Sequence, residues 1–286
     1  MIGMEFKKNA DKARNKRAFW SSTDSRVYNF IKDRLVVYKR EVELNFEDSC
    51  GPPDIGRSLH FLTELAPKPW VRKMTETWGN STHDFYYSVK NKTDLIQIEL
   101  TRKKKILMEY EQNATKFGVW LNKDFLPKVL NRLGFVVEGI NCTDYNLVTL
   151  KGDIDMILTP FRPCESKIFV EIKNALPFFD KQELSKFFKK LKQFNGLKII
   201  PVVIARKIYE IPKEILMQNQ GTYFELGKVL IPEEFKEISK NYNSNIANVT
   251  SVIPDRLIPE YILEKFTNLR KFNEGLDFSS KTFDFM

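Results

Sequence analysis

The fold and function of this chain are constrained most by two short apolar runs. Both runs carry charged residues at alternate positions. The first run extends from Gly152 to Leu158, and the second from Lys167 to Lys173. Side chains two residues apart on a strand point to the same face. If both runs are strands, their charges share one face with a few apolar residues: Asp153, Asp155, Ile157, Phe169, Glu171 and Lys173.

The segment between the runs favours a hairpin. Thr159 to Ser166 contains two prolines and several polar residues, which is typical of a loop between antiparallel strands. In such a hairpin Asp155, Glu171 and Lys173 converge. The carboxylates would repel an anionic phosphodiester unless a divalent cation lay between them. Mg²⁺, or Mn²⁺, suits a site of one or two carboxylates plus substrate oxygens. Lys173 could orient or deprotonate the attacking water, or neutralise developing charge.

This pattern resembles the PD-(D/E)xK superfamily of restriction endonuclease-like nucleases, especially its resolvase-like and archaeal-type branch. Asp155 matches the aspartate of the motif, and Glu171 and Lys173 match its second half. Ile154 departs from the pattern, because a proline gives the motif its name. The resemblance spans about residues 116 to 232 and implies an α/β (α+β) fold, in which a mixed-sheet core is flanked by helices. It implies a core order of helix, three strands, helix and strand.

Other acids are less clearly assigned. Asp153 is either a solvated neighbour of Asp155 or a further metal ligand. The family often supplies a third acid from the region before the hairpin, where Asp124 and Glu138 are available. Asp124 is also explained as the N-cap of a helix that begins there, and Glu138 as an exposed strand residue. An acid followed by Glu-x-Lys also arises by chance on any solvated strand edge. The pattern is therefore explained either by a nuclease site or by an ordinary solvated strand.

The flanking segments contain further predicted elements. Asp180 and Glu183 form a capping box, and the following stripe of Leu and Phe predicts an amphipathic helix. The opposite face of that helix carries Lys186, Lys189 and Lys190, which are solvated or hold backbone phosphates. The remaining predictions in this half are a strand to Ala205 that begins at Pro201, a helix Pro212 to Gln218, a strand Thr222 to Ile231, a loop Asn241 to Asn248 and a last helix around Ile258 to Leu269.

The N-terminal region is basic. The chain has 286 residues and a net charge of +9, and its first 40 residues contain eleven Lys or Arg and four Asp or Glu. Arg14, Lys16 and Arg17 precede Phe19 and Trp20, as in a nucleic-acid-binding arm, although a solvated tail explains them equally.

A separate basic α+β region is predicted for residues 1–100. Its expected elements are a helix Ser25 to Arg40, a strand Val42 to Phe46, helices Arg57 to Leu65 and Trp70 to Trp78, and a hairpin of Phe85 to Val89 with Leu95 to Leu100. Two helices and a hairpin with a basic tip are typical of a winged-helix unit, in which Arg72 and Lys73 would contact the nucleic-acid backbone.

The predicted organisation is completed by a connecting helix at 101–115, the nuclease core at 116–232 and a C-terminal helical extension at 233–286. Three scattered cysteines exclude a disulfide framework, and two histidines give histidine-based catalysis little material. The sequence contains neither an export signal nor a membrane-spanning apolar stretch, so we expect a cytoplasmic protein.

Together these features predict a Mg²⁺- or Mn²⁺-dependent DNA endonuclease. Its expected partner is DNA, and no association with a membrane is expected. Because one such centre cuts one strand, duplex cleavage would favour a homodimer. Two alternatives remain open: a non-catalytic nucleic-acid-binding protein on a nuclease-like fold, and an RNA-processing nuclease.

Overall fold

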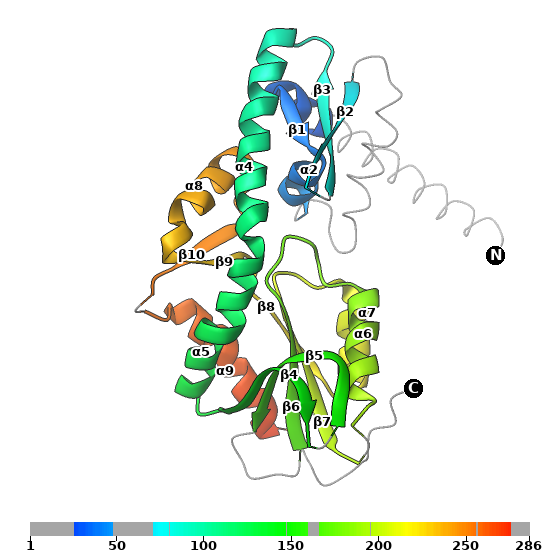
Figure 1. The fold of residues 1–286 in the computed structure, drawn as a ribbon, viewed down its shortest axis with the longest axis vertical. Coiled ribbons are helices and arrows are strands. Elements are labelled where there is room, and N and C mark those ends of the chain that lie inside the picture. The colour runs from blue at the N-terminus through cyan, green and yellow to red at the C-terminus, as the bar shows by residue number, and fades with distance from the viewer. Residues whose placement is uncertain are drawn as a thin grey trace, which may run out of the picture. The chain divides into compact units, whose positions relative to one another are not determined.

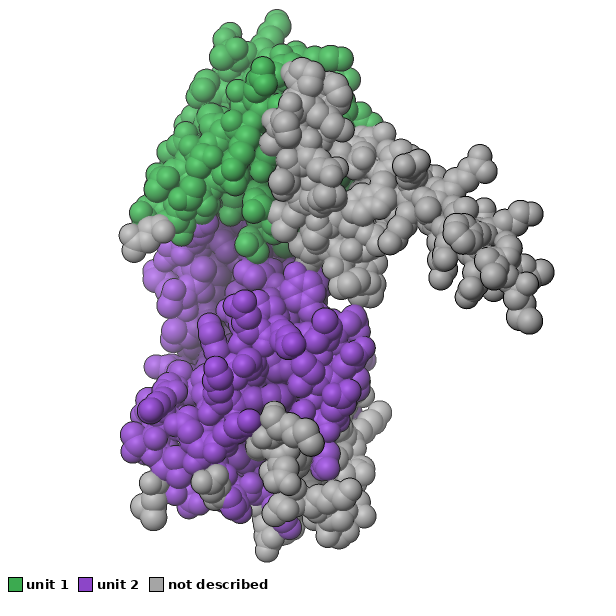
Figure 2. Space-filling model, turned by 90° about the vertical axis from the view of Figure 1, so that its right-hand side faces the viewer, with its two compact units in different colours: residues 1–108, 245–247 green, residues 109–244, 248–286 purple. Residues whose placement is uncertain are grey.

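The computed structural model describes most of the chain as two compact units. The described residues are 26–47, 71–79, 81–146, 148–159, 166–194, 196–255 and 257–275, with backbone only for 268–275. Unit 1 comprises residues 1–108 and 245–247, and unit 2 comprises residues 109–244 and 248–286 (Figure 2). Within the described ranges, no helix is both long enough and apolar enough to span a membrane.

Unit 2 is built on a five-stranded mixed sheet with the order β4-β5-β6-β7-β8 (Figure 1). Its strands are β4 (Val136–Tyr145), β5 (Val148–Thr159), β6 (Ser166–Lys173), β7 (Lys198–Ala205) and β8 (Thr222–Glu225). Strand β5 runs antiparallel to both of its neighbours, β4 and β6, so the predicted hairpin is confirmed. Strands β6, β7 and β8 are parallel, and helices make the crossovers between them.

Helices cover both faces of this sheet (Figure 1). They are α5 (Leu126–Arg132) and α9 (Glu260–Gly275) on one face, and α6 (Lys181–Leu191) and α7 (Glu210–Gln218) on the other. Alternation along the strands supplies both cores: Met156 and Val170 pack toward α5, whereas Ile157 and Phe169 pack toward α6. The order α5-β4-β5-β6-α6-β7 confirms the predicted fold class and is compatible with a restriction endonuclease-like core.

The helix before the sheet is longer than predicted. Helix α4 (Thr93–Trp120) continues through one π-helical turn, η1 (Leu121–Phe125), into α5, so the prediction that a helix begins near Asp124 is wrong. Pro127 is accommodated in the first turn of α5, where the proline's missing N–H is tolerated.

Strand β7 begins at Lys198, so the predicted start at Pro201 is also wrong. Proline is unfavourable inside a sheet because it donates no ladder hydrogen bond. Here the pairing of β7 with β8 begins only at Val202, one residue after the proline. Gly221 permits this arrangement, because a Cβ at residue 221 would lie 2.5 Å from the Pro201 carbonyl oxygen.

Three further predictions in unit 2 have mixed outcomes. The predicted strand Thr222 to Ile231 is divided: after β8 the chain turns at Gly227 (φ +78°) and forms β9 (Val229–Pro232), which pairs in parallel with β10 (Thr250–Ile253). The Asn-rich segment predicted as a loop belongs mostly to helix α8 (Lys236–Asn245), whose Ile238 and Tyr242 are buried one turn apart. The last predicted helix is confirmed as α9.

Unit 1 contains a three-stranded antiparallel sheet with the order β1-β3-β2. Its elements are a helix whose described part covers 26–33, then β1 (Val36–Tyr38), α2 (Lys39–Phe46), β2 (Val71–Trp78), β3 (Ser81–Ser88) and the first part of α4. A small core of Val27, Ile31, Val37, Val42 and Tyr86 joins the helices to the sheet.

Most of the elements predicted for unit 1 are wrong. The helix predicted for Ser25 to Arg40 is interrupted at Leu35, whose φ is +62°, and strand β1 follows. The predicted strand Val42 to Phe46 is helix α2. The predicted helix Trp70 to Trp78 is strand β2, whose backbone pairs with β3 along its whole length.

The second strand of the predicted hairpin, Leu95 to Leu100, lies in helix α4, so the winged-helix topology is wrong. The predicted helix Arg57 to Leu65 lies outside the described residues.

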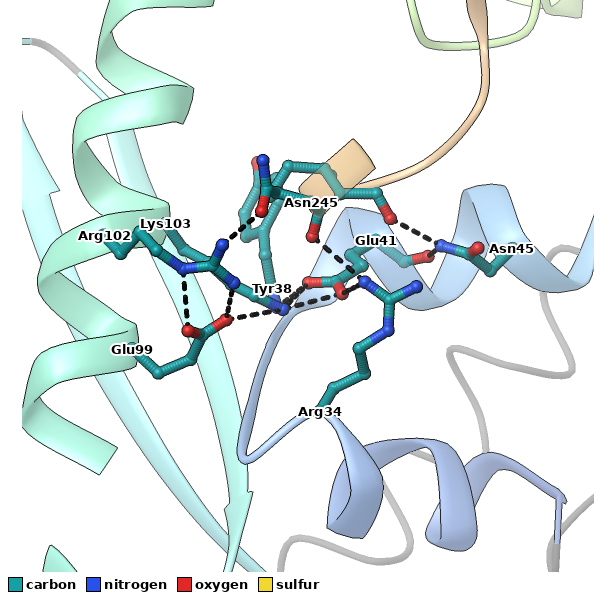
Figure 3. Close-up of polar contacts among 9 residues, drawn as sticks. Arg34, Tyr38, Glu41, Asn45, Glu99, Arg102, Lys103 and Asn245 are labelled. Carbon is teal, nitrogen blue, oxygen red and sulfur yellow. Dashed lines mark hydrogen bonds and ion pairs between the residues drawn. The ribbon is translucent and has the colours of Figure 1, made fainter. Parts of the chain in front are cut away.

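A buried ion pair joins α2 to α4 within unit 1 (Figure 3). The two carboxylate oxygens of Glu41 lie 2.7 and 2.6 Å from Nζ of Lys103, and neither side chain is exposed. Burial raises the pKa of Glu41 and lowers that of Lys103, while each charge acts to oppose the shift of its partner. One oxygen of Glu41 also accepts the Tyr38 N–H at 3.1 Å, which completes a capping box at the start of α2.

The same region of unit 1 holds residues 245–247. Arg34 donates to the Asn245 carbonyl at 3.3 Å, and the Asn45 amide donates to the Ile246 carbonyl at 2.8 Å. Arg102 donates to the Asn245 side chain and pairs with Glu99 (Figure 3). This short segment therefore depends on side chains that lie about 200 positions and 143 positions earlier in the sequence.

Candidate active site

Asp155 and Glu171 lie at the point where strands β5 and β6 separate. The last paired residues of the two strands are Met156 and Val170. Asp155 and Glu171 are the next residues beyond this pair, one on each strand. Beyond this pair, Oδ2 of Asp155 accepts the backbone N–H of Ile172 at 2.6 Å. The carboxylate thus satisfies a backbone donor that the ladder no longer pairs, and that bond fixes its orientation.

Glu171 pairs with a lysine of helix α6. Nζ of Lys190 lies 2.9 and 3.3 Å from the two carboxylate oxygens of Glu171. The side chain of Lys190 is 16% exposed and that of Glu171 is 20% exposed. The stem of Lys190 passes beside Gly152, where an added Cβ would lie 3.7 Å from Cε of the lysine. Lys190, which the sequence predicted to hold nucleic acid, therefore lies among the candidate metal ligands.

Lys173 forms an ion pair with Glu183, at the other end of the same face of α6. Glu183 also accepts the N–H of Asp180 at 3.2 Å, while Oδ1 of Asp180 accepts the N–H groups of Gln182 and Glu183. The predicted N-cap and capping box are confirmed.

Strand β6 and helix α6 thus present matched charges to each other. Glu183 and Lys190 are seven residues apart, which is about two turns of an α-helix and places them on one face. The strand carries glutamate then lysine, and each of these pairs with the opposite charge on the helix. The helix therefore holds both charged residues of the Glu-x-Lys motif in place.

Negative charge is concentrated at this site. Burial and, after it, the neighbouring charge of Glu171 together raise the pKa of Asp155 to about 7, against the opposing effects of the Ile172 N–H and Lys190. Burial likewise raises the pKa of Glu171, with Lys190 opposing and Asp153 and Glu183 adding to the shift. Two half-buried carboxylates that resist ionisation together are the environment that a divalent cation relieves.

The donor set fits Mg²⁺ or Mn²⁺ in number and type. These ions accept one or two protein carboxylates and take their other ligands from water or substrate. Among the described residues no group of three or more His, Cys, Asp or Glu side chains could hold a metal, so a site with three or four protein ligands is not formed there. Asp155 and Glu171 are the carboxylates that would bind the ion.

The other candidate acids lie elsewhere. Asp153 is exposed beside the pair. Asp124 lies on η1, and the helix that continues from it packs on the opposite face of the sheet. Glu138 accepts a hydrogen bond from Tyr145 at 2.6 Å and contacts Thr159 and Lys167 at the far end of the hairpin. The structure brings neither Asp124 nor Glu138 to the carboxylate pair.

The predicted nucleic-acid contacts are dispersed. Arg14, Lys16 and Arg17 lie outside the described residues. Arg72 and Lys73 are exposed on β2, where Lys73 pairs with Asp84 at 2.9 Å. Lys186 and Lys189 are exposed on α6. No site role was predicted for Glu183. Its seven-residue spacing from Lys190, beside a Glu-x-Lys strand, was the signal that could have revealed the two ion pairs between α6 and β6.

No family model and no curated protein matches this chain. One solved structure, that of a repair endonuclease from Pyrococcus abyssi, aligns with a TM-score of 0.29 and 11% identity. The alignment covers 54% of this chain and 65% of that chain, which is under two thirds of its length. So distant a likeness identifies neither fold nor activity, and the fold assignment rests on the order of strands and helices.

Proposed function

We propose that this chain is a divalent-metal-dependent nuclease of the PD-(D/E)xK superfamily that hydrolyses phosphodiester bonds in DNA. The observation that carries the proposal is the position of Asp155 and Glu171 at the splayed end of β5 and β6, with Lys173 two residues further along β6. A solvated strand edge would not require one of its acids to replace a ladder hydrogen bond. Nor would it leave both acids with raised pKa values.

The residues have separable roles in this proposal. Asp155 and Glu171 hold the ion, which when bound would polarise the phosphoryl group and activate a water molecule. The Ile172 N–H keeps Asp155 oriented while its second oxygen is offered to the ion. Lys173, held by Glu183, would neutralise the charge that develops on the phosphate. Lys190 would leave Glu171 when the ion binds, because both compete for the same carboxylate.

One observation favours a second candidate function. Each charged residue of the Glu-x-Lys motif already has a partner on α6, so the same four residues could serve only to stabilise the packing of α6 on the sheet. The chain would then be a non-catalytic nucleic-acid-binding protein on a nuclease-like fold. It would bind DNA in a salt-sensitive manner and would not cut it.

A cleavage assay distinguishes these functions. Wild type, Asp155→Asn and Lys173→Met are incubated with plasmid, single-stranded, branched and RNA substrates, in Mg²⁺, Mn²⁺ or chelator. We expect metal-dependent DNA cleavage that falls by about a hundredfold or more in each variant.

The matched control is Asp144→Asn, which changes an exposed aspartate of the same sheet. Cleavage that persists in chelator, or that survives Asp155→Asn, would remove this mechanism. RNA cut in preference to DNA would identify an RNA-processing enzyme instead.

A further inference from the structure

A hollow of about 330 Å³ lies in unit 2, between the helix α4-η1-α5 and the residues that precede α9. One wall carries Trp120, Lys128 and Arg132, and the facing wall includes Leu257 and Ile258. Helix α5 packs on the sheet face opposite the one that α6 covers, so this hollow is separate from the carboxylate pair. Its volume falls at the small end of ligand sites and suits a group the size of one nucleotide.

The helical wall contains an aromatic surface. The rings of Trp120 and Phe125 are stacked, with centroids 5.1 Å apart and planes 20° apart. Phe125 is 5% exposed and lies in the core, whereas Trp120 is half-buried at the edge of the hollow. An indole that is supported on one side and open to a cavity is a stacking surface for a planar ring such as a nucleobase.

Charged side chains surround that surface without neutralising one another. Lys128 and Arg132 are exposed and one turn apart on α5, and Asp124 and Asp255 line the same hollow. Within the described part of the chain, no two of these four lie within ion-pair distance, and neither cation has another ion-pair partner. The two cations are therefore available to an anion, and the carboxylates to N–H donors.

We propose that this hollow binds one unpaired nucleotide, with its base stacked on Trp120 and its phosphate held by Lys128 and Arg132. Arginine and lysine supply the charged donors that phosphate accepts, and Asp124 can accept a hydrogen bond from an exocyclic amino group of the base. A paired base cannot take this position, because both of its faces are already stacked and its pairing edge is occupied. The nucleotide is either free or part of an unpaired strand, and the two sources share the same chemistry.

Calorimetric titration of the full chain tests this binding. The ligands are deoxyadenosine monophosphate, deoxyadenosine, deoxyribose 5-phosphate, a short single-stranded oligonucleotide and a blunt hairpin duplex, all in chelator. The proposed cleavage site needs a metal ion and so plays no part in chelator. A lack of nucleotide binding would therefore not contradict the proposed nuclease activity, and a lack of cleavage would not contradict the proposed nucleotide site. We expect saturable binding of the monophosphate, with the ligands that lack base or phosphate at least about tenfold weaker.

Three variants assign the binding to this hollow. Lys128→Ala with Arg132→Ala should weaken monophosphate binding by about tenfold or more, because both exposed cations are lost. Trp120→Leu should weaken it by a similar factor. Lys123→Ala is the matched control, since Lys123 is exposed on the same helix but does not line the hollow. The double variant removes no core side chain, so the test remains valid even if Trp120→Leu unfolds.

The ligand arms give opposing outcomes. An oligonucleotide that binds more than about tenfold tighter than the monophosphate identifies an unpaired strand as the source, and comparable affinities identify the free nucleotide. The proposal is overturned if neither binds saturably, if the duplex binds as well as the single strand, or if Lys123→Ala weakens binding as much as the double variant does. Equal binding of deoxyribose 5-phosphate and the monophosphate would also overturn it, because the base would then play no part.

Discussion

Replacing Asp155 with asparagine should stabilise unit 2 at alkaline pH. Burial raises the pKa of Asp155 from 3.8 to about 7, so the folded state holds this proton more tightly than the unfolded state does. The contribution of this group to stability is therefore full below about pH 4 and is lost as the pH rises through 7. A shift of about three pH units corresponds to about 4 kcal/mol, at about 1.36 kcal/mol per unit. The asparagine oxygen can still accept the Ile172 N–H, so we expect a gain of about 1–4 kcal/mol at pH 8 and almost none at pH 4.

This gain in the free energy of unfolding is measured by chemical denaturation, with tryptophan fluorescence as the signal. Of the four tryptophans, Trp20, Trp70, Trp78 and Trp120, only Trp120 belongs to unit 2. With the other three replaced by phenylalanine, the fluorescence transition reports the unfolding of unit 2. Denaturation curves of wild type and Asp155→Asn at pH 4 and pH 8 give the difference in free energy of unfolding at each pH.

Two controls sharpen the experiment. Asp144→Asn, at an exposed position, should change the free energy of unfolding by less than about 0.5 kcal/mol at either pH. Mg²⁺ at about ten times its dissociation constant should stabilise the wild type by about 1.4 kcal/mol and leave Asp155→Asn unchanged. If the asparagine variant were no more stable than wild type at pH 8, or equally stabilised at both pH values, the reasoning from the buried carboxylate would be refuted.

Three other substitutions have defined outcomes. Lys190→Met removes the cation that competes for Glu171, so calorimetry should show Mn²⁺ binding about tenfold tighter; unchanged affinity would contradict that competition. Gly221→Ala places a Cβ against the Pro201 carbonyl and should lower the free energy of unfolding by about 1–3 kcal/mol in urea. Lys103→Met leaves Glu41 buried without its counter-ion and should cost about 3 kcal/mol by the same measurement, whereas an unchanged midpoint would show that the pair contributes little.

The parts of the fold that were predictable from sequence are those with strong local signals. The alternation along β5 and β6 identified the hairpin and the shared face of Asp155 and Glu171, because period two specifies which side chains lie together. The capping box at Asp180 identified the start of α6 in the same way. These signals need only a few consecutive residues, so no information from distant parts of the chain was required.

The errors arose where a short window fits two periods. Leu95 to Leu100 alternates like a strand, and its helical character emerges only when the buried Lys103 and Leu107 are included. Residues of β2 follow no clear alternation and form a strand because β3 pairs with them along their length. In the candidate site, the pairing of Lys190 with Glu171 depends on how α6 packs against β6, which the sequence of either element alone does not specify.

The placement of residues 245–247 in unit 1 makes that unit discontinuous in sequence. A fragment that ends at residue 108 would lack Asn245 and Ile246, and would leave Arg34, Asn45 and Arg102 without hydrogen bonds that they make in the whole chain. During synthesis, the last contacts of this unit cannot form until residues 245–247 have emerged. Dissecting this protein at a single cut would therefore yield an incomplete N-terminal piece.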